Sequence, residues 1–197
     1  MDTQRLQQQI AFILEADKEK RILRQTHITD GLRQENDAEH AWHMALMIYL
    51  LREYANEKFD LNKAMVMALI HDIVEIDAGD TYAYDKPSIA TQKNREKQAA
   101  DRLFGLLPPD QGRELRNLFE EFEENVTPEA RFAHTMDNFQ PLLLNDSNNG
   151  GDWREHGVNQ EQVMSRQNMS KLGSVAIWEY SKSLVEKNVE KGNIKKS

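Results

Sequence analysis

The apolar residues recur every three or four positions along most of the chain, and this spacing restricts the fold to helices. Leu6, Ile10 and Ile13 share one helix face in this pattern, and later segments repeat it. No segment shows the strict alternation of a convincing strand. We therefore predict an all-α bundle of about six or more helices. The predicted helices span residues 3–22, 36–54, 61–77, 89–107, 110–124, 127–144 and 159–187.

Capping residues mark several of the predicted helix starts. Asn36 and Glu39 have the spacing of a capping box, in which the two side chains bond each other's backbone N–H groups. Asn62 is expected to cap the helix after it. Thr127, followed by Pro128 at the first helical position, is expected to start another.

Other positions are expected to interrupt or end helices. Pro141 should kink the helix that begins at Thr127, because it has no backbone N–H to donate. Residues 25–35, 81–88 and 145–152 are predicted loops. The Lys-rich C-terminal tail is expected to fray.

Composition excludes several classes of function. The net charge is −8, so attraction to the phosphate backbone of nucleic acids is not expected. The chain has no cysteine, which excludes disulfides, thiolate metal sites and cysteine nucleophiles. It shows neither a signal-peptide pattern nor an apolar run of about 18 to 20 residues. We expect a single domain over residues 1–197, no nucleic-acid or membrane partner, and a cytoplasmic location.

His71 and Asp72 lie near the end of an otherwise apolar helix, in the run ALIHDIVEIDAGD. Burial of a carboxylate beside an imidazole costs free energy unless the two groups are paired or bind a metal. Glu75 follows His71 by four residues and therefore shares its helix face. The run combines a buried segment with more acidic groups than a solvated charge cluster usually has.

Two further residues extend this pattern to a possible metal site. His40 lies on the apolar face of its helix, and Asp137 is next to core-facing residues of another. Together with His71 and Asp72 they supply two imidazoles and two carboxylates from three helices. Such a set suits Mn, Fe, Co, Ni, Zn or Mg and leaves a position for water. We predict that these four residues hold one divalent metal ion.

The predicted ligands and Glu75 also have structural interpretations, as core histidines, a buried ion pair or surface charges. His134 is a rival ligand, because it precedes Asp137 by three residues on the same helix face. His43 lies one turn from His40 and is interpreted as core packing or as a group behind the ligands.

The order of these residues resembles that of the HD-domain phosphohydrolases. In that order, His40 follows the string ENDAE, His71 and Asp72 come about 31 residues later, and Asp137 follows after about 65 more. The strings ENDAEH, HDIVEIDAGD and HTMDNFQ are similar to those of the 5′-deoxynucleotidase branch. The resemblance covers roughly residues 20–145, and the helix over 159–187 suits the family's size.

The resemblance implies an all-α fold with one divalent metal ion on the four residues named above. It implies that Glu75 and Asp80 serve in catalysis, and that Asp80 and the adjacent Thr81 contact the nucleotide. An Arg before the first His would bind the phosphate. Arg24 is the first choice for that role and Arg33 the alternative. The family also tends to form homodimers.

Two departures from the branch fall where the sugar or base would be recognised. Gln25 stands where a Trp usually follows the phosphate-binding Arg, and the segment after Asp80 reads TYAYD instead of being Pro-rich. There is no further His pair after Asp72, which argues against the two-metal cyclic-nucleotide phosphodiesterases.

The predicted function is a metal-dependent 5′-nucleotidase acting on (deoxy)nucleoside monophosphates. One alternative is an HD hydrolase of nucleoside triphosphates or of an alarmone, which the acidic stretch 71–85 disfavours. Another is a non-catalytic domain that senses a nucleotide. The expected partners are a small nucleotide substrate and a second copy of the chain.

Overall fold

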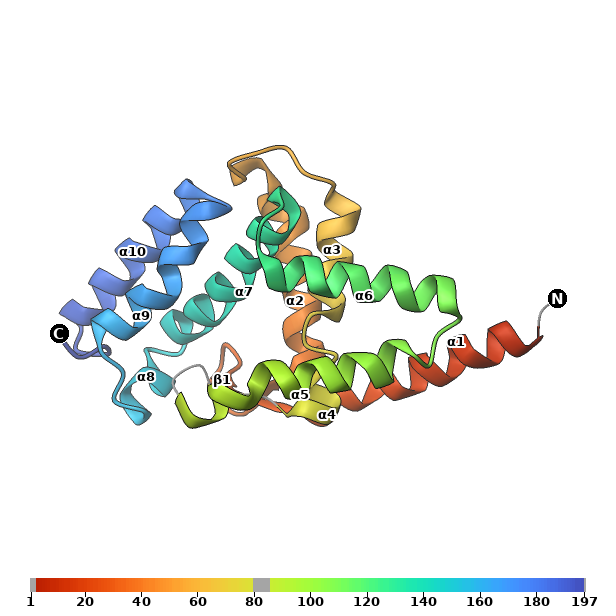
Figure 1. Cartoon of the computed structure of the whole chain (residues 1–197). Coiled ribbons are helices and arrows are strands. Elements are labelled where there is room, and N and C mark those ends of the chain that lie inside the picture. The colour runs from red at the N-terminus through yellow and green to blue at the C-terminus, as the bar shows by residue number, and fades with distance from the viewer. Residues whose placement is uncertain (1–2, 80–85, 197) are drawn as a thin grey trace.

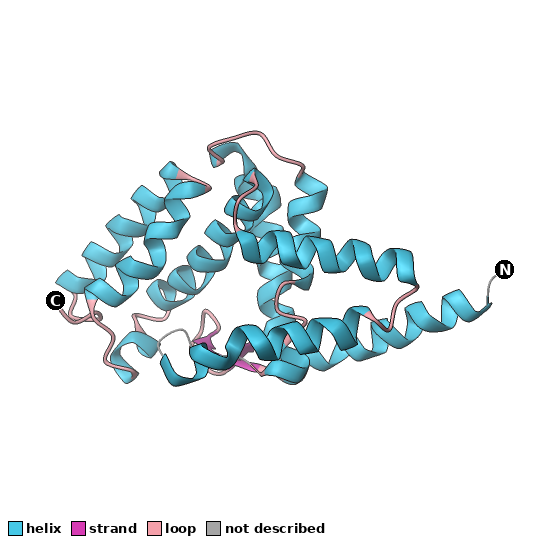
Figure 2. Cartoon of the chain, in the orientation of Figure 1, coloured by secondary structure: helices cyan, strands magenta, loops and turns pink. Residues whose placement is uncertain are grey.

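Helices make up most of the computed structural model, which describes residues 3–79 and 86–196, without the side chains of residues 86–92 (Figures 1 and 2). The helical fold predicted from the apolar spacing is confirmed. The α-helices are α1 (Thr3–Ala16), α2 (Asp37–Leu51), α3 (Leu61–Ile70), α4 (Glu75–Ala78), α5 (Lys86–Phe104), α6 (Pro109–Glu124), α7 (Pro128–Ser147), α8 (Gly151–Glu155), α9 (Gln160–Gln167) and α10 (Val175–Glu190). Short 3₁₀ helices and strands join them: η1 (Asp17–Arg21), η2 (Arg52–Tyr54), η3 (Asn168–Leu172), β1 (Leu23–His27) and β2 (Gln34–Asn36).

The main core lies where α2, α3 and α7 pack together near the middle of the molecule (Figure 1). It contains fully buried side chains from each helix, among them Met44, Met67, Phe132 and Met136. On the other side of α7, α9 and α10 pack against it. The first helix, α1, has no buried residue, and it extends to the end of the molecule opposite α10 (Figure 1). Within the described residues, none of the helices is long and apolar enough to span a membrane.

The predicted caps are found at two helix starts and replaced at a third. The Glu39 N–H donates to Asn36 Oδ1 at 2.9 Å, within the expected capping box of α2. Thr127 caps α7, whose N-terminal residue is Pro128. Asp60 caps α3 instead of Asn62, because its carboxylate accepts the N–H of the third residue of the helix.

The prediction that residues 25–35 form a loop without strands was wrong. β1 and β2 pair antiparallel, with Leu23 opposite Asn36 and His27 opposite Gln34 (Figure 2). Their sequences, LRQTH and QEN, are almost entirely polar, so they lack the apolar alternation that identifies a half-buried strand. The hairpin leads directly into α2.

The helix predicted over residues 61–77 is divided at the centre of the predicted metal site. α3 ends at Ile70 and α4 begins at Glu75, so His71 and Asp72 lie between them. There the N–H groups of Ile73 and Glu75 bond to carbonyls three residues back, as in a tighter turn. Gly79 then ends α4 at φ +74°, a conformation that favours glycine.

The C-terminal third contains more short elements than predicted. The stretch 145–152 holds the end of α7 and the start of α8, and the single helix expected over 159–187 is replaced by α9, η3 and α10. Ser174 caps α10 and so begins a new helix. The tail is also ordered by contacts, since Lys195 bonds to the backbone at both Val158 and Gln160.

Replacing Gly173 with Ala should lower the free energy of unfolding by about 1–3 kcal/mol, the usual cost of overpacking. A Cβ at this position would lie 2.3 Å from the Arg131 carbonyl oxygen and 2.4 Å from Thr135 Oγ1, both on α7. Urea denaturation measures the change. Gly151→Ala is the control, because the nearest atom to its added Cβ is at 3.5 Å. Equal stability of the two variants would contradict the prediction.

Candidate metal centre

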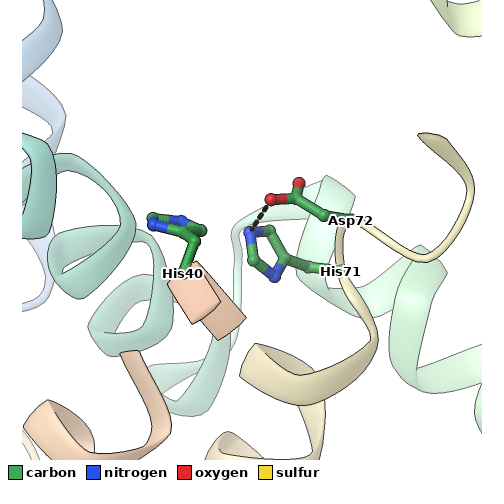
Figure 3. Close-up of side chains that lie close together, drawn as sticks. All are labelled: His40, His71 and Asp72. Atoms are coloured by element: carbon green, nitrogen blue, oxygen red, sulfur yellow. Dashed lines mark ion pairs between the residues drawn. The ribbon is translucent and has the colours of Figure 1, made fainter. Parts of the chain in front are cut away.

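The four predicted ligands converge from α2, from the turn after α3, and from α7. One ligand atom from each of His40, His71 and Asp72 lies within 4.8 Å of the others, and Figure 3 shows the three side chains close together. Asp137 Oδ1 lies 3.2 Å from His40 Nε2 and 4.0 Å from His71 Nε2. His71 Nε2 is 3.0 Å from Asp72 Oδ2. Atoms that share one ion at ~2 Å are themselves about 3 to 4 Å apart, so these spacings suit a metal.

Both imidazole rings are oriented through the nitrogen that faces away from the other ligands. His71 Nδ1 is 2.9 Å from the Ala68 carbonyl oxygen, and His40 Nδ1 is 3.0 Å from Gln140 Oε1. Each Nδ1–H therefore donates, and the Nε2 atom of each ring faces the carboxylates, where a metal would take the place of a proton. His71 Nε2 is buried and lies 3.0 Å from Asp72 Oδ2 without the geometry of a hydrogen bond, as expected of two atoms that share a metal ion.

The electrostatics of the cluster favour a bound cation. Burial opposes a charge on His71, but Asp72 and Asp137 outweigh it and raise the pKa of His71 to about 9. Burial likewise opposes ionisation of Asp137, yet a hydrogen bond from His40 and the charge of Arg166 hold its pKa well below the usual range. The same negative field that favours a proton on the ring favours a divalent ion in its place.

Behind His40 lies a buried polar chain that the sequence did not predict. Gln140 Oε1 accepts from His40, while Gln140 Nε2 donates to Glu35 Oε1 at 2.6 Å. Gln140 Nε2 is also 3.1 Å from His43 Nδ1, so His43 lies behind the ligands, as one of its two interpretations had it. Gln140 is a polar residue in the otherwise apolar run FQPLLL of α7, and this contrast is the sequence signal that could have drawn attention to it.

The rival ligand His134 has a structural position. Its Nε2 is 2.7 Å from the Phe122 carbonyl oxygen, and its ring stacks on Phe122 with centroids 3.9 Å apart. Burial lowers the pKa of His134, which keeps the ring neutral and suits a donor to a carbonyl group. The ring is therefore committed to α6 rather than to the cluster.

Arg24, and not Arg33, lies at the cluster. Arg24 Nη1 is 2.5 Å from Asp72 Oδ2 and 3.3 Å from Asp37 Oδ1. Burial opposes the charge of Arg24, but the surrounding carboxylates, Asp72 foremost, raise its pKa further. Arg33 is exposed and pairs with Glu39 at 2.7 Å, away from the predicted ligands.

Glu75 is buried at the first position of α4, one turn after the ligand pair. Its backbone N–H donates to the Asp72 carbonyl at 2.8 Å, which fixes its place relative to that ligand. Its charge contributes to the raised pKa of Arg24, so the two side chains lie within electrostatic reach. Asp80 and Thr81, the other predicted catalytic and substrate-binding residues, lie outside the described residues.

A second arginine near the cluster was not predicted. Arg166 comes from α9, and its Nη2 is 4.0 Å from Asp137 Oδ1. Arg166 Nε donates to Asn138 Oδ1 at 3.0 Å. The sequence contains no local signal for this contact, because α9 reaches α7 only through tertiary packing.

Replacing Gln140 with Leu should weaken binding of a divalent metal about 10- to 100-fold, the usual effect of losing a group that orients a ligand. The change removes the acceptor for His40 Nδ1–H. Competition with a metallochromic chelator measures the affinity, and circular dichroism verifies folding. Asn188→Leu is the control, since it removes another fully buried amide, on α10. Unchanged metal affinity in Gln140→Leu would show that the hydrogen bond from His40 to Gln140 does not support metal binding.

Comparison with known proteins shows which family the chain matches and which structures it is similar to. Residues 16–178 match the HD domain family. A predicted metal-dependent phosphohydrolase from Magnetospirillum magnetotacticum is similar in structure, with 48% identity and a TM-score of 0.92 over 96% of this chain and 95% of that one. The PH0347 protein from Pyrococcus horikoshii, 19% identical over 90% of this chain and 98% of that one, has a TM-score of 0.64 and shares the fold.

Two curated relatives are named 5′-deoxynucleotidase HDDC2. The protein from Danio rerio is 30% identical over 125 residues, which are 63% of this chain and 61% of that protein. The human protein is 29% identical over 111 residues, 56% of this chain and 53% of that protein. The matched region thus spans between about half and three fifths of the relatives' own length.

Proposed function

The chain belongs to the HD domain family, and on this basis we propose that it is a metal-dependent phosphomonoesterase that releases phosphate from (deoxy)nucleoside 5′-monophosphates. The observation that carries the proposal is the convergence of His40, His71, Asp72 and Asp137, with Arg24 bound directly to Asp72. The donor set is that of a hard or borderline divalent ion, and Arg24 adds the fixed positive charge that a phosphate requires.

Each residue has a distinct role in the proposed reaction. A divalent ion bound by the four ligands would supply an acidified water and polarise a phosphoryl oxygen. Arg24 is held by Asp72 and Asp37, so its guanidinium is positioned before the substrate arrives and stabilises charge on the phosphoryl group. Glu75 accepts the proton of the attacking water or returns one to the leaving 5′ oxygen.

The acidity of the surroundings favours a monophosphate over a polyphosphate substrate. Glu35 and Asp37 are both buried near the ligands. Burial raises the pKa of Glu19 to about 8, and the repulsion by Asp72 that adds to this effect reflects the negative field of the site. A triphosphate would bring more negative charge into this field than a monophosphate does.

The proposal is tested by stripping the metal and measuring phosphate release from nucleoside 5′-mono-, di- and triphosphates, with Mn, Co, Fe, Mg, Ni or Zn restored. The expected result is metal-restored release from monophosphates, with ribose and deoxyribose substrates compared in parallel. Release mainly from triphosphates would favour the alternative hydrolase. Tight nucleotide binding without release from any substrate would favour a sensing domain.

The one-ion stoichiometry, the single domain, the homodimer and the cytoplasmic location stay predictions from the sequence. Apolar side chains such as Val175 and Tyr180 are exposed on α10, and this surface supports the proposal that the helix takes part in self-association. Sedimentation velocity measures the state of association directly.

A further inference from the structure

We propose that Arg166 binds the substrate phosphate together with Arg24, which makes α9 part of the active site. This inference rests on the proposed function and adds to it a substrate-binding residue from the C-terminal region. Arg24 lies against Asp72, whereas Arg166 lies 4.0 Å from Asp137. The two arginines therefore adjoin two different ligands of the same predicted metal ion.

The orientation of Arg166 is fixed by its neighbours on α7. Asn138 Nδ2 donates to the His134 carbonyl at 3.0 Å, so its Oδ1 faces the other way and accepts from Arg166 Nε. The next residue, Gln167, donates from Nε2 to the Asn138 carbonyl at 2.8 Å. With Nε held by Asn138, the terminal guanidinium nitrogens are left for an anion beside Asp137.

Arg166 is also the more available of the two cations. The Arg24 side chain is 12% exposed and shares its charge among Asp72, Asp37 and Glu35. The Arg166 side chain is 31% exposed and lies near the carboxylate of Asp137. A metal ion bound to Asp137 would neutralise part of that negative charge, so less of it would remain to neutralise Arg166. A dianionic phosphate entering this acidic site gains more from the guanidinium that is less neutralised.

A cavity places Arg166 and the strand of Arg24 around the same space. The cavity has a volume of about 70 Å³, and its walls include Gln25, Thr26, Asn138 and Arg166. Neither Arg24 nor any of the four predicted ligands lines this cavity, so Arg166 is joined to the predicted metal centre through Asp137. A phosphate held at the metal would have Arg24 on the side of Asp72 and Arg166 on the side of Asp137.

The C-terminal tail, which was expected to fray, supports the helix that carries Arg166. α9 begins with a capping box between Asn159 and Gln162. Just before and within that first turn, Val158 and Gln160 each share a backbone hydrogen bond with Lys195, at 3.0 and 2.9 Å. The tail thus secures the start of the helix that presents Arg166, and a rigid element positions a binding group more accurately than a loop.

The experiment measures binding of inorganic phosphate to the Mn-loaded full chain by calorimetry, for the wild type and for Arg166→Met. The expected result is about 10- to 100-fold weaker phosphate binding in Arg166→Met, as for loss of a charged hydrogen bond, with Mn affinity unchanged. Arg166→Lys should recover part of the affinity. Arg131→Met is the control, because Arg131 is 33% exposed and pairs with Glu57 at 3.5 Å.

Two results would overturn the inference: unchanged phosphate affinity in Arg166→Met, or a loss of Mn affinity that alone accounts for the weaker phosphate binding. The second would show that Arg166 only orients Asp137. Ester hydrolysis by the same proteins separates this inference from the proposed function. If the wild type binds phosphate through Arg166 but hydrolyses no ester, only the proposed function fails. If the wild type hydrolyses monophosphates and Arg166→Met matches it in binding and kcat/KM, only the inference fails.

Discussion

Asp72→Asn should lower metal-dependent phosphate release by about 1000-fold or more, equivalent to ~4 kcal/mol in the activation barrier. Asp72 Oδ2 lies 3.0 Å from His71 Nε2 and 2.5 Å from Arg24 Nη1, so the carboxylate serves the metal and the phosphate-binding group together. Asparagine retains the shape but removes the charge that both cations require. Metal affinity should fall with the rate, since an amide oxygen is a weaker ligand than a carboxylate.

The measurement is phosphate release from a nucleoside 5′-monophosphate over a range of metal concentrations, with bound metal determined by mass spectrometry. Asp77→Asn is the matched control. Asp77 lies five residues further on and pairs with Arg102 on α5, away from the predicted ligands. Turnover and metal content like those of the wild type in Asp72→Asn would remove Asp72 from the predicted site.

The residues of the candidate site could be predicted where a local cost revealed them. His71 and Asp72 interrupt an apolar segment, and the expense of burying them singles them out without any knowledge of the fold. His40 is identified in the same way by its place on an apolar helix face. The helix caps at Asn36 and Thr127 are equally local, because a cap involves only the next three residues.

Features that depend on tertiary contact could not be predicted in this way. Gln140 orients His40 from 100 residues away, and Arg166 reaches Asn138 from a different helix. Neither contact can be deduced from the residues that lie next to it in the sequence. The β1–β2 hairpin was missed for a related reason: its polar strands are fixed by pairing with each other and by the start of α2 rather than by an apolar face.

The break between α9 and α10 shows how tertiary packing overrides helical spacing. The apolar positions continue through residues 159–187, so periodicity alone predicts one helix. Gly173 instead packs directly against the backbone of α7, where a side chain would collide with the Arg131 carbonyl. Ser174 then caps a new helix. The close approach decides the break, and it also brings α9 and Arg166 against the helix that carries Asp137.

Glu75→Gln should lower kcat about 100- to 10,000-fold, the range expected for loss of a general acid or base, while metal affinity stays the same. Glu75 is buried at the start of α4 and follows Asp72 by three residues. A role in proton transfer predicts loss of rate without loss of metal. A role as a ligand predicts loss of both.

Steady-state rates across pH and metal content of the purified variants distinguish these roles. In the wild type, ionisation of the proton-transfer group should give one limb of the pH–rate profile, and that limb should disappear in Glu75→Gln. Glu15→Gln is the matched control, because Glu15 is a partly buried carboxylate that pairs with Arg102 and Lys18 on the outer face of α1. If Glu75→Gln kept both the rate and the pH limb, proton transfer would have to be assigned to another group. The Glu75 backbone N–H donates to the Asp72 carbonyl, so Glu75 also helps to fix the turn after α3. If Glu75→Gln kept its activity, that turn would serve only to place the metal ligands.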